Sequence, residues 1–397
     1  MTFSALLESL KSFFRWLETQ NDLLLLGVPF VLIIPRAILA GDNLIGDESS
    51  FYEPIKTFGL NAFSVIENTK NLRIPQGPGF FAVYGFFGSF VDYSLPALRL
   101  LNILVSYLAA LILFKILCKL SNFPIILTLW FVLNPYFLLL TTPYIYTDNL
   151  CLFFLISGTY FFIVKDQRLL AGLCWSLAIW TRQLAIFVPI AAILTDFYFD
   201  RHNLKQQVRA VLDNSLPLLA TMVLFLLWGY SLTPPNNEYT NSTETFAFSL
   251  RQLNYAIILT GVCATPLWLP NLRQLFRVPY LSGAIIFLPS IFFRFPRRVN
   301  QDAEFWTMET AGYFDKTLIW IGDFAFLVVP FLWIVSLAFL FRHLAPALNS
   351  RTHGFAILCI VFFWGIEAVY TFAWDKYFLM IIPFLLSLQE KKTRASS

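Results

Sequence analysis

The sequence is short of charge for a chain of 397 residues. Only 13% of the residues are charged and 58% are hydrophobic, whereas an ordinary soluble domain carries about 25% charged residues. The mean hydropathy is correspondingly high, at +0.67. The 28 Lys and Arg residues are scattered between apolar segments and form no continuous basic stripe, so we expect no nucleic-acid partner. The composition predicts an all-α polytopic membrane protein.

Signatures of several enzyme classes are also absent. The sequence has no Walker motif, no Gly-rich dinucleotide fingerprint and no HExxH pair, so nothing supports a nucleotide-driven pump or a zinc protease. The five cysteines lie in apolar segments without paired spacing, which predicts packing residues rather than disulfides or a zinc site. There is no internal repeat and no hydrophilic domain, so residues 1–397 are expected to form a single membrane-embedded domain.

Long apolar runs are abundant, and they predict about twelve transmembrane segments. A helix of about 20 apolar residues covers a hydrocarbon core about 30 Å thick. The pair 169–181 and 184–197 is short and predicts a hairpin that stops short of two full spans. The candidate segments are residues 23–40, 97–117, 123–140, 149–164, 169–181, 184–197, 214–231, 252–269, 279–293, 318–341, 354–372 and 377–389.

Basic loops indicate how these segments are oriented. With a cytoplasmic N-terminus, the short inner loops are consistently basic, as the positive-inside rule requires, and Lys115 and Lys119 are examples. Residues 41–96 then form one long outer loop. Core spans in residues 97–200 follow this loop, and the remaining spans and a C-terminal segment lie in residues 201–397.

The long outer loop is expected to be functional, because loops of this length without their own domain usually are. It contains a stretch rich in Phe and Tyr near residues 50–60, and an apolar stretch at residues 79–90 that follows a Pro-Gly segment at 75–79. The second stretch has only about a dozen residues, too few for a span. Both stretches are predicted to be interfacial helices.

Three groups of polar residues fall on the predicted outer face. The acidic pair Asp47-Glu48 follows the first span, Asp148 begins the fourth, and Arg182 lies with Gln183 at the tip of the short hairpin. Ionisable residues at membrane depth are functional candidates because a charge stranded in lipid is costly. The three histidines all fall on the predicted inner side, so a base on the outer face would have to be a carboxylate.

These groups belong to a wider set of motifs that resembles the GT-C superfamily of integral-membrane glycosyltransferases. Within that superfamily, the set is most similar to the dolichyl-phosphate-glucose-dependent α-1,2-glucosyltransferases. The motifs are Asp47-Glu48, the Pro-Gly segment before an aromatic stretch, Leu98-Arg99-Leu100-Leu101-Asn102, Tyr146-Thr147-Asp148, Thr181-Arg182-Gln183 and Asp375-Lys376-Tyr377.

The resemblance implies a GT-C-like helical bundle and a hexosyltransferase in a bacterial inner membrane or the endoplasmic reticulum. Its donor would be a hexose, such as glucose, on a polyprenyl or dolichyl phosphate carrier. Its acceptor would be a hydroxyl of a lipid-linked glycan or of another molecule. Transfer would take place on the outer or lumenal face, in contact with membrane lipid.

The chemistry of such a transfer sets requirements for the site. A base must take the acceptor proton while the hydroxyl attacks the anomeric carbon, and cationic groups or a divalent cation must stabilise the departing phosphate. We expect Asp47 to be the base, with Glu48 as its neighbour or as a metal ligand, and Asp148 to help hold a metal or the acceptor. The residues expected to bind substrate are Tyr146, Arg182, Gln183, Arg294, Arg297, Arg298 and Lys376.

Several of these residues also have a structural explanation. An acidic pair commonly does no more than solvate a loop. Asp148 is suited to capping the helix that it begins, and Arg182 would snorkel to the interface. Nearby acidic residues would neutralise the arginines of residues 294–298, or the predicted topology is displaced by one span at that point.

The competing functional class is a secondary transporter or lipid flippase that uses intramembrane carboxylates such as Asp323 and Glu367. Transporters often consist of two related halves with broken helices in matching positions, and the sequence shows no such symmetry. A third alternative, a non-catalytic membrane scaffold, predicts that the outer acidic residues are dispensable. The sequence favours the glycosyltransferase, because the charges are concentrated at the outer ends of the predicted spans.

Overall fold

The structure is a computed structural model that describes residues 22–61, 64–201, 203–231, 233–235, 248–286, 324–369 and 375–389. Every regular element in these residues is a helix. The all-α prediction is therefore confirmed for the described part of the chain.

From α2 to α12 the described helices follow one another with short connections. From the start of the described residues to position 199 they are α2 (Asp22–Leu39), α3 (Glu48–Leu60), α4 (Val65–Lys70), α5 (Pro78–Phe90), α6 (Leu95–Leu120), α7 (Pro124–Val132), η2 (Tyr136–Thr141), α8 (Thr147–Tyr160), η3 (Phe161–Lys165), α9 (Arg168–Thr181), η4 (Gln183–Ile186) and α10 (Phe187–Phe199). The later helices are α11 (Leu204–Asp213), α12 (Ser215–Leu227), α13 (Leu250–Cys263), α14 (Thr265–Trp268), η5 (Leu269–Asn271), α15 (Leu272–Leu275), α16 (Val278–Ile286), α18 (Ala325–Asn349), α19 (Arg351–Val369), η8 (Asp375–Met380) and α20 (Ile382–Ser387).

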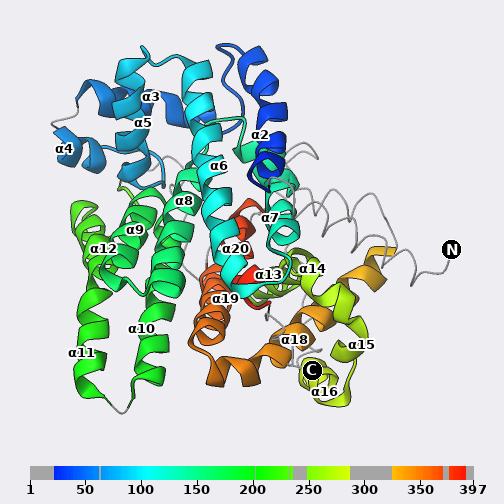
Figure 1. Ribbon diagram of the computed structural model, residues 1–397. Helices are drawn as coiled ribbons and strands as arrows, with labels where there is room; N and C mark the ends of the chain where they lie inside the picture. Colours follow the sequence, from blue (N-terminus) through cyan, green and yellow to red (C-terminus); the bar gives the residue numbers. More distant parts are fainter. Residues whose placement is uncertain are drawn as a thin grey trace.

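The connections lie toward two ends of the molecule (Figure 1). At one end, α3, α4 and α5 gather beside α2 and the first turns of α6. At the other end, the chain turns between α10 and α11 and between α18 and α19. Through the middle, α8 packs against α6 and α9, while α19 packs against α10, α13 and α18.

Five of the described helical stretches are long and apolar enough to cross a membrane. They are Asp22–Leu39, Leu95–Leu120, Thr147–Lys165, Leu327–Asn349 and Arg351–Val369. Two bent helix pairs raise the number to seven if each pair crosses as one span, and these are Leu204–Asp213 with Ser215–Leu227 and Gln252–Cys263 with Thr265–Leu275. These helices make the chain a multi-pass integral membrane protein.

The described residues therefore correct the predicted number of about twelve spans to five to seven. The stretch 123–140 is interrupted at Pro135, which separates α7 from a π-helical turn, and the stretch 377–389 is divided between η8 and α20. Helices of 13 or 14 residues, such as α10 and α9, cover only about 20 Å at 1.5 Å per residue, less than a hydrocarbon core of about 30 Å. The prediction that the segments 169–181 and 184–197 are too short for two full spans is confirmed, because both are found among the shorter apolar helices.

The predicted outer loop contains two helices where the sequence indicated them. α3 begins at Glu48, and α5 begins at Pro78, which suits the first turn of a helix because proline has no N–H to leave unpaired there. The two helices bury aromatic side chains against each other. The ring of Phe81 lies 6.2 Å from that of Phe51 and 5.8 Å from that of Phe58. We call this unit, residues 48–90, the cap.

The close approach of α3 to α5 predicts that one added methyl group destabilises the cap. An alanine Cβ at position 85 would lie 2.6 Å from the backbone N of Gly59 and 2.7 Å from the carbonyl O of Ile55. We expect Gly85→Ala to cost about 1–3 kcal/mol, because overpacked backbone atoms cannot move aside easily. The measurement is the thermal unfolding midpoint in detergent. Gly365→Ala is the control, since nothing lies within 4 Å of its added Cβ, and equal midpoints for the two variants would contradict the close packing.

Candidate functional site

Glu48, the first residue of α3, is wholly buried and pairs with Arg99 of α6. Arg99 Nε donates to Glu48 Oε1 at 2.9 Å, and Nη2 donates to Oε2 at 2.6 Å. Each carboxylate oxygen also accepts a backbone N–H, from Ile145 at 2.8 Å and from Ile45 at 2.9 Å. Four hydrogen bonds fill the acceptor capacity of a carboxylate, so this geometry leaves Glu48 little capacity to bind a metal.

The Arg99 guanidinium also reaches the chain that leads into the cap. It donates to the carbonyl of Gly41 at 2.7 Å through Nη1 and to that of Asn43 at 2.5 Å through Nη2. The Glu48–Arg99 pair therefore ties α6 to the segment between α2 and α3. This segment carries Asp47, whose backbone position is fixed by these bonds.

Asn102 lies one turn further along α6 and fixes a second segment, which leads into α8. Its Nδ2 donates to the carbonyls of Thr141 and Tyr144, both at 2.6 Å. Its Oδ1 accepts a hydrogen bond from the Tyr84 hydroxyl of α5, also at 2.6 Å. The sequence motif that contains Arg99 and Asn102 therefore positions both of the segments that carry candidate site residues.

Asp47 is adjacent to Glu48 in the sequence but has a different partner. Its Oδ2 lies 2.6 Å from Lys376 Nζ, and the Asp47 side chain is 31% exposed, compared with 5% for Lys376. The ammonium also lies 5.3 Å from the ring centre of Tyr146. Burial raises the pKa of the Tyr146 hydroxyl above its ordinary value, so this hydroxyl stays protonated. Asp47 is thus a partly accessible carboxylate beside a buried cation.

A second ion pair joins the start of α8 to the end of α9. Arg182 Nη1 lies 2.5 Å from Asp148 Oδ1, and both side chains are buried. The guanidinium also lies 4.6 Å from the ring centre of Tyr377. Arg182 therefore does not snorkel toward an interface. Asp148 does not provide a helix cap either, because α8 begins at Thr147 and no side chain caps it.

The two ion pairs are neighbours because the start of α8 and η8 each supply a residue to one pair and an aromatic ring beside the other. Tyr146 and Asp148 lie at the start of α8, whereas Lys376 and Tyr377 follow each other in η8, and α8 contacts η8. Asp47 and Lys376 are 329 positions apart in the sequence. The site therefore combines the residue just before the cap, the start of α8, the end of α9 and η8.

Two glycines permit the segments to approach. Gly46 has φ of +60°, and a Cβ there would lie 2.5 Å from the Tyr146 hydroxyl oxygen. Gly77, just before α5, donates its N–H to the carbonyl of Thr181 at 3.1 Å, and a Cβ there would collide with the carbonyl of Trp180. The Pro-Gly segment noted in the sequence thus packs against the chain that leads to Arg182.

The structure brings together most of the residues that the sequence singled out. Those at this end of the molecule are Asp47, Glu48, Tyr146, Asp148, Arg182, Gln183 and Lys376. Arg294, Arg297, Arg298 and Asp323 lie outside the described residues. Sequence reasoning missed two members of the site. Tyr377 lies within a quoted motif but was given no role, and Glu367, which is within electrostatic reach of Arg182, was noted only as a residue inside a span.

The positive charge that the described site offers to a phosphate comes from Lys376 and Arg182. Among the residues that the structure describes, no group of three or more His, Cys, Asp or Glu side chains is placed to hold a metal ion. Glu48 and Asp148, which were considered as metal ligands, each bond an arginine instead.

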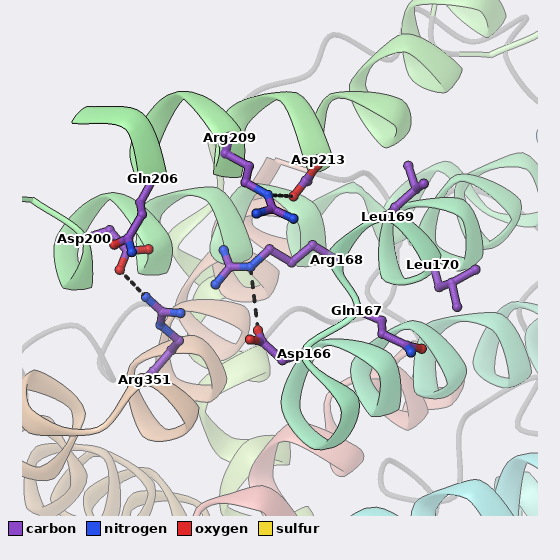
Figure 2. A pocket seen from close by; sticks show the side chains of 10 residues that line it. All are labelled: Asp166, Gln167, Arg168, Leu169, Leu170, Asp200, Gln206, Arg209, Asp213 and Arg351. Carbon is purple, nitrogen blue, oxygen red and sulfur yellow. Dashed lines mark hydrogen bonds and ion pairs between the residues drawn. The ribbon is translucent and has the colours of Figure 1, made fainter. Parts of the chain in front are cut away.

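A cavity of about 580 Å³ lies at the start of α9 (Figure 2), whereas Arg182 follows the last residue of that helix. Its walls come from the segment before α9, the end of α10, one face of α11 and the start of α19. Its charged pairs are Arg351 with Asp200, Arg209 with Asp213 and Arg168 with Asp166. Acidic groups oppose each of these arginines, as they oppose Arg182 and Lys376.

Comparison with protein-family models, curated proteins and solved structures finds no match to this chain. The class is therefore defined by the structure alone. It is an all-helical, multi-pass integral membrane protein in which ion pairs from distant segments meet beside a helical cap.

The Glu48 carboxylate accepts four hydrogen bonds, so we predict that substitution of Glu48 strongly destabilises the fold. Glu48→Gln leaves Arg99 without its counter-charge, and breaking a buried pair in this way costs about 3–5 kcal/mol. We expect a clearly lower thermal unfolding midpoint. Glu53→Gln on the same helix is the control, because Glu53 is exposed and its contact with Lys56 is 3.5 Å long, which predicts little change. If both variants unfold at the wild-type temperature, the Glu48–Arg99 pair does not support the fold.

Proposed function

We propose that this protein is a membrane hexosyltransferase that takes its sugar from a polyprenyl or dolichyl phosphate carrier and transfers it to an acceptor hydroxyl. The observation that carries the proposal is an accessible carboxylate, Asp47, paired with the buried ammonium of Lys376 and lying beside the Asp148–Arg182 pair. A base and phosphate-binding cations are the two requirements of this reaction. The resemblance of the sequence motifs to GT-C glycosyltransferases supports the same class.

In the proposed reaction, Asp47 accepts the proton of the acceptor hydroxyl while the hydroxyl oxygen forms a bond to the anomeric carbon. The bond from that carbon to the phosphate oxygen breaks, and its electron pair leaves with the phosphate. A single displacement of this kind inverts the anomeric centre. A β-linked donor would therefore yield an α-linked product.

Arg182 and Lys376 stabilise the departing phosphate in this mechanism. An ammonium carries three N–H donors and a guanidinium five, so each can bind a carboxylate and a phosphate oxygen at the same time. The planar fork of Arg182 suits two phosphate oxygens in particular. Its orientation is supported by the bond to Asp148 and by the ring of Tyr377.

Glu48 and Asp148 act as positioning residues in this proposal. Glu48 fixes the backbone from which Asp47 projects, because it bonds Arg99 and two backbone N–H groups. Asp148 aligns the guanidinium of Arg182. The reaction then needs one catalytic carboxylate, Asp47.

The location of the site supports a reaction on the outer or lumenal face of a bacterial inner membrane or of the endoplasmic reticulum. Basic residues such as Arg168 and Arg209 gather at the opposite end of the molecule, which the positive-inside rule assigns to the cytoplasm. The donor and a lipid-linked or other hydroxyl acceptor would approach from the side of the cap. A transporter would instead be expected to keep its key charges near the bilayer midplane.

Asp47→Asn provides the direct test of the catalytic assignment. We expect the substitution to lower sugar transfer by about 10²–10⁴-fold, the usual contribution of a general base, without loss of fold. Purified protein would be incubated with radiolabelled polyprenyl-phosphate hexoses and hydroxyl acceptors. Asp92→Asn is the matched control, since Asp92 is exposed between α5 and α6 and its φ of +49° is one that asparagine tolerates.

The possible results of this assay separate the two parts of the proposal. Full activity of the Asp47→Asn variant would show that Asp47 is not the base. No transfer by the wild-type protein from any polyprenyl-phosphate hexose would overturn the enzyme itself, and a transporter or a scaffold would then be the better explanation.

The assigned orientation predicts that the cap and α11 face opposite sides of the membrane. In a variant without its five native cysteines, a cysteine at position 53 should react with a membrane-impermeant maleimide from the outer side. A cysteine at position 209 should react with the same reagent only after the membrane has been permeabilised with detergent. The side chains at both positions are largely exposed, so labelling of both from one side would contradict the orientation.

A further inference from the structure

Glu367 is a buried acidic residue that the proposed reaction does not use. It lies two residues before the end of α19, it is 0% exposed, and neither of its carboxyl oxygens has a hydrogen-bond partner. It is within electrostatic reach of both Arg182 and Tyr377, so it belongs to the surroundings of the second ion pair. Buried polar groups are normally hydrogen-bonded, and an unpaired carboxyl group at a candidate site therefore points to a ligand.

Three other buried atoms share this property, and they belong to Asp148 and to residues adjacent in the sequence to Asp148 and Arg182. Asp148 Oδ2, Thr147 Oγ1 and Gln183 Nε2 have no hydrogen-bond partner. Asp148 bonds Arg182 through its other oxygen, Thr147 precedes Asp148, and Gln183 follows Arg182. Together with Glu367, these atoms comprise carboxyl acceptors, a hydroxyl that both donates and accepts, and an amide donor.

This mixture of donors and acceptors does not match a phosphate. Phosphate oxygens at neutral pH only accept hydrogen bonds, so they cannot pair with the unpaired carboxylate oxygen of Asp148. The hydroxyls of a sugar ring match the set, because each of them both donates and accepts. We infer that Thr147, Asp148, Gln183 and Glu367 form the subsite for the sugar ring of the donor. The inference rests on the proposed function, which puts the donor phosphate at Arg182.

The unpaired atoms also give this subsite a means of selecting its sugar. Buried polar groups without partners raise the free energy of the ligand-free protein, and a ligand that bonds to them removes this cost. A hexose whose hydroxyls meet all of these groups gains affinity. An isomer that leaves one of them unpaired is discriminated against strongly, as in other sites built to bind a hydroxyl.

The test compares two kinds of phosphodiester probe that carry the same single negative charge. One is the methyl ester of a polyprenyl phosphate, which we call the bare lipid phosphate, and the other is the same lipid phosphate carrying β-linked glucose, mannose or galactose in place of the methyl group. Binding to the purified protein in detergent is measured by thermophoresis. We expect the preferred hexose to raise the affinity of the wild-type protein about ten-fold over the bare lipid phosphate, as one or two new hydrogen bonds would.

Glu367→Leu should remove most of the gain in affinity that the hexose provides. It should leave the affinity for the bare lipid phosphate unchanged, and the unfolding midpoint should also stay the same. An apolar side chain in place of an unpaired buried carboxyl should not weaken the fold. Glu367→Gln, which keeps the shape and one acceptor, should retain part of the gain. Thr147→Val is a second, similarly shaped variant and should also reduce the gain, whereas Glu53→Gln on the cap should not.

The outcomes test the sugar subsite separately from the proposed transfer reaction. If Glu367→Leu weakens binding of both probes equally, or if the wild-type protein shows no gain from any hexose, the subsite is overturned even where sugar transfer is observed. If the gain depends on Glu367 and Thr147 but the wild-type protein transfers no sugar, the subsite stands and the transferase proposal fails.

Discussion

The buried Glu48–Arg99 ion pair is the interaction on which the rest of the site depends. Two charges removed from water are costly unless their geometry is good and their remaining donors and acceptors are satisfied. Here the guanidinium meets both carboxylate oxygens and the carbonyls of Gly41 and Asn43, and the carboxylate accepts two backbone N–H groups. One pair thus fixes the chain after α2, the start of α3, the first turns of α6 and the segment before α8.

Each ion pair of the site joins one cation to one carboxylate, and the pairs differ in how exposed their side chains are. Arg99, Arg182 and Lys376 each bond a carboxylate, which makes three buried cations tolerable in a poorly solvated environment. The Glu48–Arg99 pair is wholly buried, whereas the Asp47 side chain is 31% exposed. Exposure therefore distinguishes the Glu48–Arg99 pair from the Asp47–Lys376 pair, whose carboxylate is partly accessible.

The sequence was sufficient to predict the helical class and the residues that gather at one end of the bundle, because both follow from apolar run length and basic loops. It could not assign different roles to Asp47 and Glu48. Adjacent residues share the same local context, and their partners, Lys376 and Arg99, come from distant parts of the chain. The number of spans was overestimated because hydropathy does not detect helix breaks, such as the one at Pro135, or helices too short to cross.

The distribution of charge along α9 bears on the choice between an enzyme and a transporter. Arg168 begins the helix and pairs with Asp196, while Arg182 follows its last residue and pairs with Asp148. Between these two pairs, the buried positions before the final threonine are filled by Ala, Gly, Trp, Ala and Ile. A transporter needs a polar route for its solute from one face to the other, and this face of α9 offers none. An enzyme that works on one face needs only the polar groups at one end, which is the arrangement that the Asp148–Arg182 and Asp47–Lys376 pairs provide.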